Sequence, residues 1–386
     1  MSRAIGRPAP WQWLRPVFTG FDAPLGAAML MLAAIGLVTM YSAGYDHGTR
    51  FTDHGRNMLV ALAVLFAVAQ VPPQKLLRVA VPLYAAGVLL LVVTAVPGMG
   101  ITRKGATRWL DLGVVIQPSE ILKIAAPMML AWWFQRREGQ LRSFDFGVAA
   151  LLLAVPVILV ARQPDLGTAL LILFGGIYVM FFAGLSWRLV LPVLALALVG
   201  VVALIVAEPT LCAEGVRWPV LREYQQQRVC TLLDPARDPL GKGFHILQGM
   251  IAIGAGGLTG RGFMSGTQTH LEFIPERTTD FIFAAFCEEF GLAGVALLFG
   301  SFLFLILRGL AIAAEAPTVF ARLLAAAVTM SLFTYVFVNI GMVSGILPVV
   351  GVPLPFISYG GTAMVSLGLA IGILMSAARS PRLMQS

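Results

Sequence analysis

Long apolar stretches alternate with short charged segments along almost the whole chain. Residues 323–378 contain no charged residue, and charges only interrupt two other apolar stretches, at 118–135 and 280–307. Further stretches without Asp, Glu, Lys or Arg are 23–45, 57–74, 79–102, 146–161, 166–187 and 189–207. A helix needs about 20 apolar residues to cross the bilayer core, and residues 323–378 are long enough for two helices around a Pro- and Gly-rich reversal at 351–361. The pattern therefore predicts an all-α integral membrane protein with about ten transmembrane helices.

Composition also favours a membrane protein. The chain is 58% hydrophobic and only 12% charged, with a mean hydropathy of +0.86, whereas soluble domains carry about 25% charged residues. A soluble enzyme is therefore excluded. The net charge of +8 would suit nucleic acid in a soluble chain, but here it marks cytoplasmic loops, so we expect no nucleic-acid partner. We also expect no cleavable signal peptide, because no small-residue cleavage site closes the first apolar stretch.

Basic residues sort to one side of the predicted helices. With the N-terminus inside, the inner segments hold Arg3, Arg7, Arg15, Lys75, Arg78, Arg136, Arg137, Arg142, Arg188, Arg308, Arg379 and Arg382. The outer loops hold fewer, apart from the group of Arg103, Lys104 and Arg108 before the fourth helix. Because basic residues collect in cytoplasmic loops, we expect a multi-pass protein of the cytoplasmic (inner) membrane with both termini in the cytoplasm.

Residues 208–279 form a long outer loop between the seventh and eighth predicted helices. A loop of this length is more often functional than structureless. We expect short helices over 217–233 and 245–253, lying at the membrane interface. The whole chain, 1–386, is treated as one membrane domain with its core at 21–378.

Two of the three cysteines lie in this outer loop. Cys212 and Cys230 are on the side where disulfides form, while the third, Cys287, lies in the eighth predicted helix. A disulfide that closes the loop between these two cysteines contributes roughly 3 kcal/mol to stability in the chain-entropy model. We favour a Cys212–Cys230 disulfide over two free thiols.

Ionisable residues at membrane depth are the first candidates for a functional site, because such groups are costly there. They are Arg108, Glu120, Lys123, Asp165, Asp280 and Glu288. The fourth, sixth and eighth helices all enter from the outer face, so most of these residues lie within about one turn of that face, beside Trp109. They can converge on one cavity that opens outward.

Most of these residues also have an ordinary structural interpretation. Glu120 favours the positive end of a helix that starts at Pro118, and it can simply neutralise Lys123. Asp165 and Asp280 can be helix-start residues. The shared outer side is what argues for a site.

The chemistry of such a cavity is only partly fixed by these residues. Arg and Lys favour an anionic ligand such as the pyrophosphate of a lipid carrier, and a carboxylate can act as a general base. Trp109 can anchor the membrane interface or stack on a sugar, and Glu288 needs a buried partner or a proton. No metal-pair, Ser-His-Asp or phosphate-loop motif is present. A lipid flippase or a proton-coupled transporter fits the same features.

Several motifs resemble those of the SEDS family (shape, elongation, division and sporulation). They are Gly-Ala-Thr-Arg-Trp-Leu at 105–110, Gln-Pro-Ser-Glu at 117–120 with Lys123, Gln-Pro-Asp-Leu-Gly-Thr at 163–168, Asp-Pro at 234–235, Asp-Pro-Leu-Gly at 238–241, Gly-Thr-Gln at 266–268, Glu-Phe-Ile-Pro-Glu-Arg at 272–277, Thr-Asp-Phe-Ile-Phe at 279–283, and Asn339, Gly345, Pro348, Gly351, Pro353 and Pro355 before Ser-Tyr-Gly-Gly-Thr at 358–362. The resemblance covers about 21–378, and the segment at 266–283 is similar to the rod-shape branch rather than the division branch. The family often has His where Thr278 stands here, so that position is assigned no role.

The resemblance implies a peptidoglycan glycosyltransferase that polymerises lipid II on the outer face of the membrane during cell elongation. It implies two partners, a class B penicillin-binding protein that cross-links the product and the wider elongation machinery. Asp280 matches the aspartate that the family is thought to need. We expect Asp280 to be a general base for the acceptor sugar, or alternatively to hold a metal or orient the acceptor. A lipid II flippase without bond chemistry and a scaffold are the competing interpretations.

The resemblance also suggests where substrate is held. The expected pyrophosphate contacts are Arg108, Lys123 and Arg277, and the other expected substrate contacts are Trp109, Glu120, Asp165 and Glu276. A divalent cation, Mg²⁺ or Mn²⁺, is implied without identified ligands, and no organic cofactor is implied.

Overall fold

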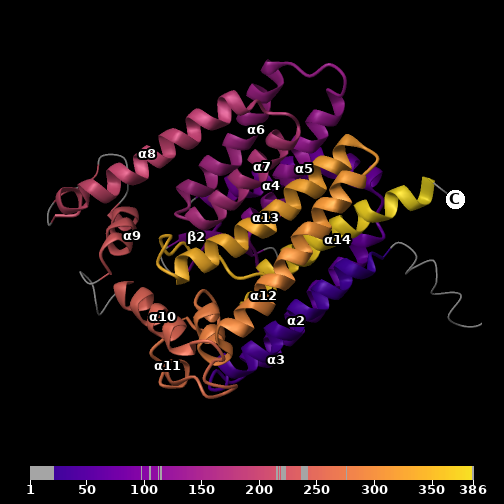
Figure 1. Cartoon of the computed structure of the whole chain (residues 1–386). Coiled ribbons are helices and arrows are strands. Elements are labelled where there is room, and N and C mark those ends of the chain that lie inside the picture. The colour runs from indigo at the N-terminus through magenta and orange to yellow at the C-terminus, as the bar shows by residue number, and fades with distance from the viewer. Residues whose placement is uncertain are drawn as a thin grey trace, which may run out of the picture.

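The computed structural model describes residues 21–96, 98–103, 106–111, 113, 115–213, 216, 218, 223–235, 242–274 and 276–384. Those residues form a bundle of long helices that run roughly side by side (Figure 1). The expectations placed on Arg3, Arg7, Arg15, Lys104 and residues 238–241 lie outside the described residues.

The long helices follow the predicted apolar stretches. They are α2 (Ala23–Ala43), α3 (Arg50–Ala69), α4 (Pro73–Ala95), α5 (Pro118–Arg136), α6 (Ser143–Arg162), α7 (Leu166–Phe182), α8 (Trp187–Leu211), α12 (Ile282–Glu315), α13 (Val319–Val343) and α14 (Gly361–Met384). Within the described part of the chain, seven helices are long and apolar enough to cross a membrane. α3 and α5 are less apolar and α7 has 17 residues. The chain is a multi-pass membrane protein, and ten crossings stay a prediction.

A small antiparallel sheet departs from the all-helical expectation. β1 (Ile101–Arg103), β2 (Ala106–Asp111) and β3 (Val115–Ile116) form a three-stranded sheet in sequence order. The predicted third span at 79–102 therefore ends too late, since α4 stops at Ala95 and Gly98 follows with a φ of +86°. Positive φ is a conformation that favours glycine and ends a helix. The β-branched residues beyond it suit strands rather than another helical turn.

Three shorter helices lie between α8 and α12. They are α9 (Glu223–Leu233), α10 (Lys242–Gly256) and α11 (Thr267–His270). The helices expected at 217–233 and 245–253 are thus confirmed with different bounds, although Arg217 and residues 219–222 lie outside the described part. In Figure 1, α9, α10, α11 and β2 lie at one end of the bundle, and α14 ends at the opposite end.

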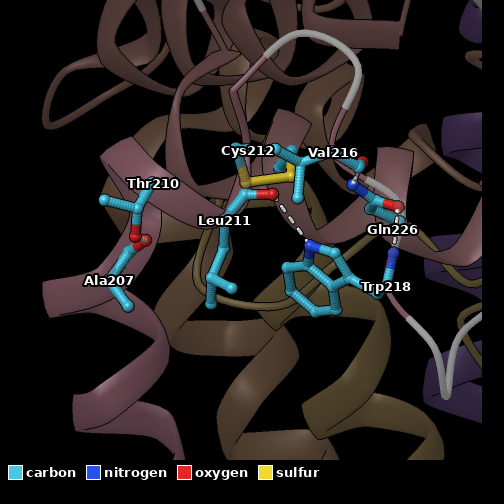
Figure 2. Close-up of a disulfide and its surroundings, with 8 residues drawn as sticks. Ala207, Thr210, Leu211, Cys212, Val216, Trp218 and Gln226 are labelled. Carbon is cyan, nitrogen blue, oxygen red and sulfur yellow. Dashed lines mark hydrogen bonds between the residues drawn. A yellow bond between two sulfur atoms is a disulfide. The ribbon is translucent and has the colours of Figure 1, made fainter.

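α8 runs along the outside of the bundle and has no buried residue (Figure 1). Its C-terminal end is joined to α9 by a disulfide between Cys212 and Cys230, with Cα atoms 5.7 Å apart. Figure 2 shows the indole nitrogen of Trp218 donating to the carbonyl of Leu211, at 2.8 Å. The favoured cysteine pairing is therefore present, and it joins an outer helix to the loop helices.

α12 is interrupted near its start, at Gly291, where φ is +59° and ψ is −161°. A Cβ there would lie 2.2 Å from the nitrogen of Gly260, so only glycine fits this contact between the long loop and α12. At the other end of the helix Arg308 donates to Asp22 at the start of α2, at 2.6 Å. Both ends of α12 are thus fixed to neighbouring segments.

Candidate active site

A cavity of about 190 Å³ lies at the end of the bundle that carries the loop helices. Its lining residues come from α9, α10, the turn before α12 and the loop before α14, and they are Arg228, Thr231, His245, Ile246, Glu276, Asp280, Phe281 and Val349. Asp280 and Glu276 were both expected at a functional site. The structure brings their carboxylates to one cavity.

Asp280 lies in a turn, not in the first turn of a helix. Phe281 is the residue that precedes α12, and its backbone nitrogen donates to the carbonyl of Glu276 at 3.2 Å. The Thr279 hydroxyl donates to a carboxylate oxygen of Glu276 at 2.9 Å. The span predicted at about 280–307 therefore starts at Ile282, because these turn hydrogen bonds replace the helical ones at Asp280. Asp280 is set apart from the helix on which Glu288 lies.

Residues of α13 and of the loop between α13 and α14 hold this turn by donating hydrogen bonds to its backbone carbonyls. Tyr359 donates its backbone nitrogen to the carbonyl of Thr278 at 2.8 Å, and the Ser358 hydroxyl donates to that of Thr279 at 2.7 Å. The amide of Asn339 on α13 donates to the carbonyl of Asp280 at 3.1 Å. Three consecutive carbonyls are thereby fixed. The Ser-Tyr motif and Asn339 position Asp280, which gives those sequence features a physical role.

Thr278 itself is buried and has a structural partner. Arg50, at the start of α3, donates to its hydroxyl at 3.2 Å, and the same guanidinium lies 4.6 Å from the ring centroid of Tyr359. Thr278, where the family that this chain resembles often has His, is therefore part of the packing behind the turn.

Arg277 is buried behind the turn, and its guanidinium donates hydrogen bonds to three groups. It donates to the carbonyls of Ala43 at 2.9 Å and Thr269 at 3.0 Å, and to the carboxylate of Asp46. Burial by itself would raise the pKa of Asp46, but hydrogen bonds from Arg277 and His47 outweigh it and hold that pKa well below its usual range. Arg277 thus fixes the long loop to the end of α2, and the structure places it outside the lining of the cavity.

Arg108 and Asp165 form a second cluster between β2 and α7. Their side chains are 3.4 Å apart, and Arg108 also donates to the carbonyl of Pro164 at 2.7 Å. Asp165 accepts from Gln117 at 3.3 Å and caps α7. A Cβ on Gly167 would lie 2.6 Å from the carbonyl of Val350, so this cluster packs on the loop that lines the cavity.

Trp109 is half-buried in β2, opposite Ile101. It follows Arg108 in the chain and is not a lining residue of the Asp280 cavity. Its expected contact with a sugar stays a prediction.

Glu120 and Lys123 form a third cluster inside the bundle. Their side chains are 2.6 Å apart, and Ser366 on α14 donates to the other oxygen of Glu120 at 2.9 Å. Lys123 lies 5.3 Å from the ring centroid of Tyr335. Lys123 and Tyr335 line a separate cavity of about 20 Å³. The pair thus behaves as the ordinary interpretation suggested, and it does not line the Asp280 cavity.

Glu288 has the partners that its burial requires. One oxygen accepts from the backbone nitrogen of Gln268 at 2.8 Å, and the other accepts from the nitrogen and hydroxyl of Thr269 at 3.1 and 3.0 Å. A Cβ on Gly266 would lie 2.7 Å from that second oxygen. The Gly-Thr-Gln motif is therefore the segment that satisfies this buried carboxylate.

Three polar lining residues were not predicted: Arg228, Thr231 and His245. Burial lowers the pKa of His245, and the nearby Glu276 carboxylate partly opposes that shift. All three lie on loop helices rather than at membrane depth, where the cost of burying a charge marks a residue as a candidate. The useful signal would have been the shared face of Arg228 and Thr231 on an amphipathic helix.

The implied divalent cation finds no ready protein site. Among the described residues, no group of three or more His, Cys, Asp or Glu side chains could hold a metal ion. Magnesium is usually bound through one or two carboxylates together with substrate phosphates and water. The residues present do not fit a preformed cation site, and the cation stays a prediction.

Comparison with known proteins finds relatives that match almost the whole chain. A family model described as Cell cycle protein (FTSW_RODA_SPOVE) matches residues 23–383. The peptidoglycan glycosyltransferase MrdB of Escherichia coli K12 is 48% identical over 350 residues, covering 90% of both chains. The stage V sporulation protein E of Bacillus subtilis is 33% identical over 375 residues, covering 94% of this chain and 98% of that protein.

Two solved structures are also similar. One is described as showing structural coordination of polymerization and crosslinking by a peptidoglycan synthase complex. Its matching chain has a TM-score of 0.77 and 34% identity, covering 93% of this chain and 98% of that one. The other is the rod shape determining protein RodA of Thermus thermophilus, with a TM-score of 0.66 and 27% identity, covering 93% and 97%.

Proposed function

We propose, starting from the fact that this chain belongs to the FtsW/RodA/SpoVE family of cell cycle proteins, that it is a peptidoglycan glycosyltransferase of the inner membrane. It polymerises lipid II into glycan strands during cell elongation. The relative MrdB carries the name of this activity at 48% identity. The observation that carries the proposal is the Asp280 carboxylate, which lines a cavity and whose turn is held by three hydrogen bonds to its backbone carbonyls.

The proposed reaction joins two sugars and releases a lipid pyrophosphate. Asp280 accepts the proton from the 4-hydroxyl of the acceptor's N-acetylglucosamine as that oxygen attacks the anomeric carbon of the donor's N-acetylmuramic acid. The new carbon–oxygen bond forms as the bond to the undecaprenyl pyrophosphate oxygen breaks, with inversion at the carbon. Alternatively, Asp280 orients the acceptor without taking its proton.

The departing pyrophosphate needs positive charge nearby. Arg108, Lys123 and Arg277 are the cations expected from the sequence, and each has an intramolecular carboxylate partner. Lys123 and Arg277 are also buried. To contact the pyrophosphate, each of these side chains therefore has to leave its carboxylate partner. No step of this mechanism is routed through a divalent cation.

The cavity faces the periplasm in this proposal, and both termini lie in the cytoplasm. The basic residues of the short loops support that orientation. The position of the cavity and of the end of α14 at opposite ends of the bundle is consistent with it. The proposed partner is a class B penicillin-binding protein, because a similar chain was solved in a complex that couples polymerization to crosslinking.

The test is a polymerisation assay on the full chain, with and without its penicillin-binding partner. Labelled lipid II is incubated with the protein, and the products are separated on a gel. A ladder of glycan strands is the expected result. If no ladder forms while lipid II crosses between the leaflets of protein-containing vesicles, the chain is a flippase and the proposal is wrong.

A further inference from the structure

α9 forms the wall of the cavity that faces the Asp280 turn. Arg228 and Thr231 are three residues apart on this helix, so both project from one face, and both line the cavity with Asp280 and Glu276. Among the described lining residues, Arg228 is the one permanently charged cation. The wall therefore brings positive charge to the same space as the Asp280 carboxylate.

We propose that Arg228 binds the pyrophosphate of the lipid-linked donor and stabilises it as it departs. The inference rests on the proposed glycosyltransferase function and assigns one of its substrate contacts. A guanidinium pairs with phosphate oxygens through two parallel hydrogen bonds, and its charge is worth most where the leaving group gains negative charge. Arg228 lines the space where bond cleavage is proposed, and Lys123 and Arg277 are not among the lining residues.

The Cys212–Cys230 disulfide holds this wall in place. Cys230 is two residues from Arg228, and positions two apart on a helix point to nearly opposite faces. The disulfide therefore ties the outer face of α9 to the end of α8 while Arg228 faces the cavity. Gln226 adds to this attachment, because it donates to the carbonyl of Val216 at 2.7 Å and accepts from the nitrogen of Trp218 at 3.2 Å.

The attachment matters because α8 is long and apolar enough to cross the membrane. It has no buried residue, so the membrane rather than the bundle holds α8, and the disulfide keeps α9 at the C-terminal end of α8. The disulfide is then a positioning element for Arg228. Its reduction allows α9 to move and weakens the hold on the donor pyrophosphate.

The first test compares Arg228→Gln, Arg228→Lys and Gln227→Ala in the lipid II polymerisation assay. Gln227 is the exposed neighbour on α9 and lies outside the cavity lining. We expect Arg228→Gln to raise the KM for lipid II at least tenfold and to weaken inhibition by undecaprenyl pyrophosphate to the same degree. Arg228→Lys should recover part of both, and Gln227→Ala should change neither.

The second test reduces the disulfide in folded wild-type protein and compares it with a Cys212→Ser/Cys230→Ser double variant. We expect a several-fold rise in the KM for lipid II in both, with no further effect of reductant on the double variant or on Arg228→Gln. Size-exclusion chromatography confirms that each protein is folded. An unchanged KM in the reduced protein overturns the positioning role of the disulfide.

Failure of this inference is distinct from failure of the proposed function. If the wild type makes no glycan, the proposed function is wrong. If the wild type polymerises lipid II, and Arg228→Gln keeps both the KM and the inhibition by undecaprenyl pyrophosphate, then only the assignment of Arg228 is overturned.

Discussion

Glu288 shows what a buried carboxylate in a membrane protein requires. Both of its oxygens accept from backbone nitrogens of the 267–269 segment, so an amide in its place would point an NH₂ group at one of those donors whichever way it turned. We expect Glu288→Gln to lower the free energy of unfolding by about 1–3 kcal/mol. Thermal unfolding in detergent measures this. Glu315→Gln, an exposed change on the same helix, is the control and should leave the midpoint unchanged.

The Asp46–Arg277 pair predicts a pH dependence of stability. Burial raises the pKa of Asp46, but the hydrogen bonds from Arg277 and His47 hold it well below its usual value. A lowered folded-state pKa means that the stabilisation is full above about pH 4 and is lost as the pH falls through the folded-state pKa.

Asp46→Asn should therefore unfold more easily than the wild type at pH 7, and the difference should shrink steadily below about pH 4. Thermal unfolding across pH measures both. Asp53→Asn removes an ion pair between a half-buried carboxylate and the exposed Arg56, and it should have a much smaller effect than Asp46→Asn at pH 7. A difference that stays constant from pH 7 to pH 3 would contradict the account.

For single residues, the sequence identified candidate charges by their expected depth in the membrane, but it did not identify most of their partners. Asp280 and Glu288 stand out because charges are rare in apolar stretches. The partners of Arg277 and Glu288 come from distant segments, which no local pattern connects. Arg228 was missed because a charge on a polar loop helix carries no cost that would mark it.

The broken start of α12 is the clearest prediction at the scale of elements. A Cβ on Gly291 would meet the nitrogen of Gly260 at 2.2 Å, and the positive φ adds backbone strain. We expect Gly291→Ala to destabilise the protein by about 1–3 kcal/mol, as seen in the midpoint of thermal unfolding. Gly300 on the same helix has nothing within 4 Å of its Cβ position, so Gly300→Ala should leave the midpoint unchanged or raise it slightly. Equal midpoints for the two variants would contradict this packing.

Apolar length predicted the long helices well because backbone groups in lipid must be satisfied within a helix. The ends of helices were predicted less well. α3 begins at Arg50, seven positions before the predicted 57, since a helix can continue beyond the apolar stretch and carry Asp53 and Arg56, which pair at 3.0 Å, on its first turns. The β-sheet was missed because its first residues continue an apolar stretch.

The orientation of the whole molecule can be tested by labelling single cysteines. Thr49 lies beside α3 at the cavity end and Gln140 lies in the loop between α5 and α6 at the other end, and both are exposed. The native cysteines are bonded or buried. In intact cells whose outer membrane has been permeabilised, an impermeant maleimide should label Thr49→Cys and not Gln140→Cys. The reverse pattern would place the cavity in the cytoplasm.

The central claim is that the cavity of Asp280 is the site of a glycan polymerase. The most direct measurement is the lipid II polymerisation assay on purified wild type and Asp280→Asn, each with its penicillin-binding partner. We expect a glycan ladder from the wild type and none from the variant, while the variant keeps its thermal unfolding midpoint and its lipid II binding. A ladder of equal rate from the variant would contradict the central claim.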